Sequence, residues 1–163
     1  MKRTSPLPLL AALGLSMACG CGKAPPPPPE SSEAHIHQSH APHSGTVVAL
    51  GDGQFHVELV LDPAAGRLQA YVLDDELENF VRSPSHSVDV SVRRGGTTKS
   101  VTLVAVANPA TGETVGDTAL FEGQAEWLRA TSSFEGTIGS MAVRGSTFTK
   151  VPFSFPGGDK PAR

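Results

Sequence analysis

Short runs of β-favouring residues, each closed by a glycine-containing turn, recur along the chain from Thr46 to Phe155. Early in that stretch Gly51-Asp52-Gly53 separates two runs, and Asp62-Pro63 opens a second turn that Gly66 closes. Turns of this composition join neighbouring antiparallel strands. The spacing predicts an all-β fold, an antiparallel β-sandwich of immunoglobulin-like or related topology that covers residues 43–156.

The second of these hairpins has a register that can be predicted. Pairing Leu61 with Leu68 closes the turn, and strand side chains alternate between the two faces of a sheet. One face then becomes purely apolar, with Val57, Leu59, Leu61, Leu68, Ala70 and Val72. The opposite face brings His56 and Glu58 together near Tyr71, and we expect it to be the less buried face.

Only the segment DTALFEGQAEWLRATS departs from the β pattern. Phe121, Ala125 and Leu128 lie at i, i+4 and i+7, a spacing typical of one helical face. The spacing predicts one short helix from about Glu122 to Arg129, covering one end of the sandwich.

The N-terminus has the features of an export signal. Lys2 and Arg3 precede an apolar run from Leu7 to Leu15, which is shorter than the roughly 20 residues that span a bilayer. The following stretch, which holds Cys19 and Cys21, resembles the lipobox of bacterial lipoproteins. That resemblance implies a signal peptide over residues 1–18 and a lipidated Cys19, with Cys21 as the alternative. It also implies membrane attachment in the bacterial cell envelope, with the domain facing the periplasm or the extracellular side.

Residues 19–42 are expected to form a disordered stalk, and residues 157–163 a disordered tail. The five prolines of Pro25–Pro29 favour extended polyproline II, which makes a semi-rigid spacer. No cysteine follows Cys21. The domain must therefore be held together by its apolar core without disulfides.

Four of the six histidines, His35, His37, His40 and His43, lie between the prolines and the first predicted strand. Neutral imidazoles suit divalent Cu, Ni and Zn, and short histidine-rich tracts are compositional metal binders. Ordering a flexible arm costs about 1–2 kcal/mol per fixed residue, so we expect modest affinity. The alternative is a polar linker in which the histidines have no special role.

A metal site in the fold itself would use His43, His56 with Glu58, or His86 as ligands. The first hairpin places His56 close to Val48, whereas His43 lies beyond the far end of that strand. A site that joins His43 to His56 therefore requires the chain before Thr46 to fold back.

We do not expect an enzyme or a nucleic-acid-binding protein. The chain has no Gly-x-Ser-x-Gly, no His-Glu-x-x-His and no glycine-rich phosphate loop. Its formal net charge of -3 gives no basic footprint for nucleic acid.

Several short motifs resemble those of a small, uncharacterised β-domain of exported bacterial lipoproteins. That domain opens with a His-Gly-Gly-like turn, followed by His-x-Glu-Leu, an Asp…Gly turn and Tyr-Val-Leu-Asp. The corresponding residues are His43-Ser44-Gly45, His56-Val57-Glu58-Leu59, Asp62…Gly66 and Tyr71-Val72-Leu73-Asp74. Similar segments occur in periplasmic adaptor subunits of heavy-metal efflux pumps.

These observations predict a lipid-anchored binding or accessory module that handles a divalent transition metal in an efflux or resistance context. Its partners would be the membrane and an efflux-pump component or another envelope protein. The alternative is an interaction module of the envelope that binds a protein and no metal.

Overall fold

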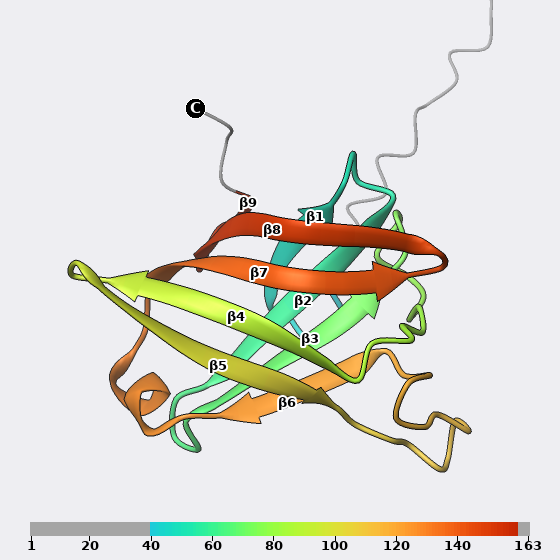
Figure 1. Cartoon of the computed structure of the whole chain (residues 1–163), viewed down its shortest axis with the longest axis horizontal. Coiled ribbons are helices and arrows are strands. Elements are labelled where there is room, and N and C mark those ends of the chain that lie inside the picture. The colour runs from blue at the N-terminus through green and yellow to red at the C-terminus, as the bar shows by residue number, and fades with distance from the viewer. Residues whose placement is uncertain (1–39, 160–163) are drawn as a thin grey trace, which may run out of the picture. The chain divides into compact units, whose positions relative to one another are not determined.

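The computed structural model describes residues 40–159, and these form one continuous antiparallel sheet (Figure 1). The strands neighbour one another in the order β1-β2-β3-β6-β5-β4-β7-β8-β9. One short 3₁₀ helix, η1, lies between β6 and β7. The bounds are β1 Thr46–Leu50, β2 Phe55–Asp62, β3 Arg67–Leu73, β4 Ser87–Arg94, β5 Thr97–Ala105, β6 Leu120–Gln124, η1 Glu126–Ala130, β7 Phe134–Val143, β8 Ser146–Phe155 and β9 Gly158–Asp159. The all-β prediction is confirmed.

The sheet curls until its two edge strands meet, which makes a nearly closed, barrel-like sandwich. Gly158 of β9 lies so close to β1 that a Cβ atom there would overlap the carbonyl oxygen of Val47. Gly158 also has a φ of 86°, a conformation that favours glycine. The interior is filled by apolar side chains from every strand from β1 to β8; the large ones include Phe121, Phe153, Leu50, Leu59, Leu68 and Leu103.

The predicted register of the β2–β3 hairpin is confirmed. Leu61 pairs with Leu68, and Glu58 pairs with Tyr71. Val57 and Leu59 point into the core from β2, and Leu68 and Val72 do so from β3. Alternation along each strand therefore directs His56 and Glu58 to the outer face of the sheet.

The outer face of β2 is more buried than the sequence predicted. The side chain of Glu58 is 0 % exposed. Residues 43–45, which precede β1, fold back over β2 and cover it: a Cβ atom on Gly45 would lie 2.7 Å from Glu58 Cγ. The expectation of a less buried face was wrong for Glu58. The alternation of side chains within a hairpin cannot predict that a segment from elsewhere in the chain, here residues 43–45, will cover one face of it.

Two predicted boundaries also differ from the structure. The segment 120–124 continues the sheet as β6, and η1 begins only at Glu126 and ends at Ala130 rather than Arg129. The domain extends past residue 156, because Gly158 and Asp159 pair with β8. Residues 160–163 of the predicted tail, and the predicted signal peptide and most of the stalk, lie outside the described residues.

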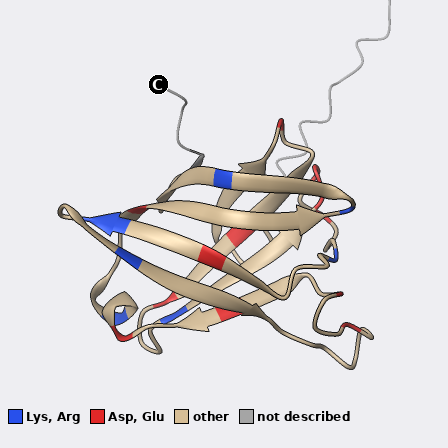
Figure 2. Cartoon of the chain, viewed as in Figure 1, with Lys and Arg blue, Asp and Glu red and all other residues tan. Residues whose placement is uncertain are grey.

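Charged residues of both signs are spread over the strands and loops (Figure 2). The described helix, η1, is far too short and too polar to cross a membrane, and residues 40–159 contain no helix that could do so.

Candidate functional site

The candidate site is built around a hydrogen-bonded pair, His43 and Glu58. One carboxylate oxygen of Glu58, Oε1, accepts the backbone N–H groups of His43 at 2.8 Å and of Gly45 at 2.7 Å. The other, Oε2, lies 2.9 Å from Nδ1 of the His43 imidazole. The carboxylate thereby gains three partners at a position without solvent, as a buried acidic group requires.

The chain reaches this geometry through a tight turn. The N–H of Ser44 donates to the carbonyl oxygen of Ala41 at 3.0 Å, and Ser44 itself has a φ of 56°. Gly45 then passes directly over β2, where a side chain would meet the Leu59 carbonyl oxygen at 2.6 Å. The fold-back that a site using His43 requires is therefore present, and it leads to Glu58 rather than to His56.

Ser44 occupies a left-handed conformation that costs a non-glycine residue about 1–2 kcal/mol. Glycine lacks that cost but loses more backbone entropy on folding. We therefore expect Ser44→Gly to raise the free energy of unfolding by about 0.5–1 kcal/mol in urea titrations. Ala41→Gly, in the same turn but without a positive φ, should not stabilise the protein. A lower free energy of unfolding for Ser44→Gly than for the parent would contradict the claim that the backbone at Ser44 is strained.

The His43 ring lies flat against Tyr71. The two ring centroids are 3.9 Å apart and the planes differ by 17°. Phe80, in the loop after β3, lies beside this pair: its ring is tilted to both, and its centroid is 6.0 Å from the centroids of His43 and of Tyr71. Partial burial, together with the nearby carboxylates Glu58 and Glu122, raises the pKa of the Tyr71 phenol above its ordinary value, although Arg67 opposes this. Packing on one face and a hydrogen bond at one edge thus fix the orientation of the imidazole.

This orientation decides which nitrogen of His43 is available. A carboxylate only accepts hydrogen bonds, so Nδ1 is the nitrogen that donates to Glu58, and in the neutral imidazole the lone pair is then on Nε2. Metal-binding histidines generally donate their other ring N–H to a carboxylate or carbonyl in this way. The His43 side chain is 36 % exposed and lines a cavity of about 380 Å³.

The other predicted ligands within the described residues do not join this pair. His56 Nδ1 lies 3.0 Å from the carbonyl oxygen of Asp74, which holds the ring at the end of β3. His86 is exposed just before β4, and its ring lies beside Gly116. His40 is exposed at the start of the described chain. Residues 40–159 contain no group of three or more His, Cys, Asp or Glu side chains placed to hold one metal ion. His35, His37, Cys19 and Cys21 lie outside the described residues.

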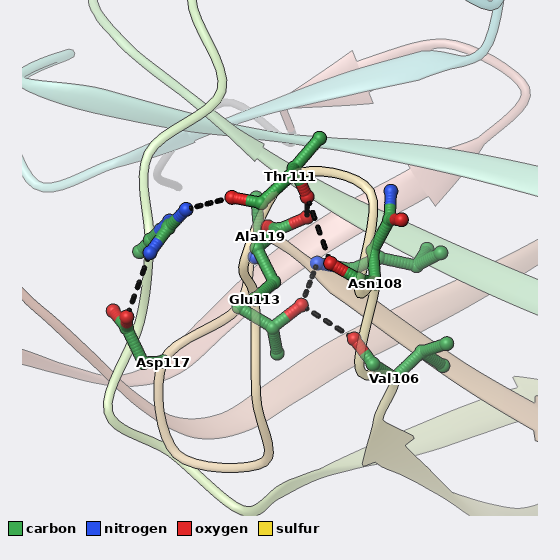
Figure 3. Close-up of polar contacts among 9 residues, drawn as sticks. Val106, Asn108, Thr111, Glu113, Asp117 and Ala119 are labelled. Carbon is green, nitrogen blue, oxygen red and sulfur yellow. Dashed lines mark hydrogen bonds and ion pairs between the residues drawn. The ribbon is translucent and has the colours of Figure 1, made fainter.

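No pattern in the sequence indicated the loop residues that complete the cavity. Phe80 and Arg82 come from the segment between β3 and β4, and Asn108, Thr111 and Glu113 come from the segment between β5 and β6. Figure 3 shows how the second segment folds on itself. Only a cluster of polar and aromatic residues in long connections could have hinted at it.

Comparison with protein-family models, with curated proteins and with solved structures finds no match for this chain.

Proposed function

We propose that the protein is an exported, lipid-anchored accessory module of the bacterial cell envelope that binds a divalent transition metal through His43. The observation that supports this most is the contact between His43 Nδ1 and a fully buried carboxylate. The Glu58 carboxylate fixes both the tautomer and the direction of the imidazole, which lowers the entropy lost when Nε2 binds an ion.

The remaining ligands would come from the histidines that precede His43. His40, His37 and His35 stand three, six and eight residues before it in the sequence, close enough along the chain to reach the same ion. A set of neutral imidazoles suits divalent Cu, Ni or Zn and is poorly matched to Ca²⁺ or Mg²⁺, which prefer oxygen ligands. An ion held by one oriented histidine and by histidines that precede it in the sequence suits transfer to an efflux or resistance partner better than permanent storage.

Metal titration of the mature chain, prepared without a polyhistidine tag, tests this proposal. We expect calorimetry with Zn²⁺, Cu²⁺ and Ni²⁺ to show binding that His43→Ala weakens at least tenfold. Glu58→Gln should weaken it by about 10–100-fold while leaving every imidazole in place, because the amide no longer enforces the Nδ1–H tautomer.

His86→Ala is the matched control, since His86 is exposed and lies beside Gly116 rather than Glu58. It should bind metal as the parent does. Simultaneous replacement of His35, His37 and His40 by alanine should also weaken binding. An affinity unchanged by His43→Ala would contradict the proposal, and equal losses in His43→Ala and His86→Ala would indicate nonspecific binding.

One observation favours a second candidate, a protein-interaction module of the envelope that needs no metal. Phe80 is 51 % exposed although it is a large aromatic side chain, and such residues are enriched where proteins dock. Crosslinking from membranes with and without a chelator separates the two. If an efflux-pump component is captured and the chelator abolishes its capture, the result supports metal handling. If an envelope protein is captured equally well with and without the chelator, and Phe80→Ala abolishes its capture, the result supports docking.

A further inference from the structure

The cavity beside His43 has features that a single metal ligand does not explain. It is bounded on one side by the outer face of β3 and on the other by the loops before β4 and β6. Its apolar lining comes from Tyr71, Phe80 and Leu120, and its charged lining from Arg82 and Glu113. A volume of about 380 Å³ is at the small end for ligand pockets, which suits a compact guest.

Three rings form a corner in this cavity. The stacked pair His43 and Tyr71 makes one wall, and Phe80 makes the other at interplanar angles of 41° and 47°. Phe80 is equally distant from the two stacked rings, at 6.0 Å between centroids, so it stands beside the stack. A group that enters the corner therefore meets Phe80 together with the stacked pair. Aromatic faces carry the negative part of the ring quadrupole and attract cations within about 6 Å.

Arg82, the positive charge that lines the cavity, is already neutralised. One terminal nitrogen, Nη1, donates to Asp117 at 2.8 Å, and the other, Nη2, donates to the carbonyl oxygen of Thr111 at 2.6 Å (Figure 3). An anionic guest would therefore have to displace a carboxylate from Arg82. The cavity is poorly suited to anions for this reason.

The negative charge of Glu113, in contrast, is held in place by two uncharged donors. Its Oε1 accepts the N–H of Ala119 at 2.8 Å, and its Oε2 accepts the hydroxyl of Thr111 at 2.6 Å (Figure 3). Glu58 adds a second negative charge at the Nδ1 edge of the His43 ring.

We propose that this cavity binds a small organic cation of the quaternary ammonium type, which contacts Phe80 and the stacked pair of His43 and Tyr71 and is attracted by Glu113. This goes beyond metal handling, because it uses a different chemistry and depends on Phe80 and Glu113. The methyl groups of such a cation bury apolar surface while its charge, which is weakly hydrated, remains near the rings and the carboxylate.

The test compares choline with 3,3-dimethyl-1-butanol, its neutral isostere of the same shape. With the metal-free mature chain, NMR titration should show choline binding at the residues of the cavity, with an affinity at least three- to tenfold above that of the isostere. Equal affinities for the two molecules would overturn the proposal, because binding would then be apolar only. Absence of choline binding at concentrations of tens of millimolar would overturn it as well.

Variants locate the site and separate it from the metal proposal. Phe80→Leu keeps an apolar side chain at an exposed position and should weaken choline binding about three- to tenfold. Phe148→Leu removes a ring that contacts Phe55, packs against the core and does not line the cavity, so this control should leave choline binding unchanged. Phe80→Leu should leave metal affinity unchanged, so each proposal can fail alone. Unchanged choline affinity in Phe80→Leu would overturn the assignment.

Vesicles of phosphatidylcholine and of phosphatidylglycerol test whether the bound ammonium group belongs to a lipid headgroup or to a soluble molecule. Binding of phosphatidylcholine vesicles that Phe80→Leu reduces would place the ammonium group on a lipid headgroup. Binding of free choline without such vesicle binding would place it on a soluble molecule. Both results support the cationic site, whereas preference for phosphatidylglycerol would contradict it.

Discussion

Replacing Glu58 with alanine is expected to lower the free energy of unfolding by about 3–5 kcal/mol. The change removes a carboxylate that has no solvent exposure and leaves the backbone N–H groups of His43 and Gly45 without an acceptor. Each buried donor left unpaired costs about 1–3 kcal/mol, and the vacated space adds a further loss. Urea denaturation followed by tryptophan fluorescence measures the change.

Two further variants serve as controls for Glu58→Ala. Glu76→Ala removes an exposed carboxylate from the loop after β3 and should change stability by less than about 0.5 kcal/mol. Glu58→Gln keeps the shape and an oxygen that accepts backbone N–H groups, so it should cost about 1–2 kcal/mol. If Glu58→Ala lost no more stability than Glu76→Ala, the buried contact between Glu58 and the segment before β1 would be refuted.

Gly45→Ala is expected to destabilise the protein by about 2–3 kcal/mol. A Cβ atom there would lie 2.6 Å from the Leu59 carbonyl oxygen and 2.7 Å from Glu58 Cγ, so the turn must move away from β2. Because that movement separates His43 from Glu58, metal affinity should fall together with stability. Thermal and urea unfolding, paired with zinc titration, measure both effects.

Gly139→Ala serves as the comparison for this prediction. A Cβ atom on Gly139, in β7, would lie 3.0 Å from the carbonyl oxygen of Asp89 in β4, which is a milder contact than at Gly45. It should cost less stability and leave zinc affinity unchanged. A Gly45→Ala protein with parental stability and zinc affinity would show that the segment does not lie against β2.

Much of the sheet could be predicted because the signals were local. Alternation on both sides of the Asp62–Arg67 turn fixes the pairing of Leu61 with Leu68, since any one-residue slip would expose the apolar face. The pairing of Glu58 with Tyr71 follows from the same register. The helix was predicted too early because the spacing of Phe121, Ala125 and Leu128 also arises where a strand runs into a 3₁₀ turn.

The site itself depends on contacts that no local pattern encodes. The burial of Glu58 requires a left-handed residue at Ser44, a position without the glycine that would signal it. The cavity is lined by the segment that precedes β4 in the sequence and by the segment that follows β5. The order of the strands in the sheet brings these two segments together. His43 lies just before β1, at the entrance to the fold. Among the predicted ligands in residues 40–159, the one that it contacts is Glu58.

The most direct test of the site formed by His43 and Glu58 is a long-range ¹H–¹⁵N correlation spectrum of the histidine rings during zinc titration. We predict that metal-free His43 has its proton on Nδ1, and that its Nε2 resonance shifts at substoichiometric Zn²⁺ while the Nδ1–H signal persists. His56 and His86 should change little. A His43 ring protonated on Nε2, or one whose resonances do not respond to zinc while other histidines do, would contradict the role of Glu58 and of His43.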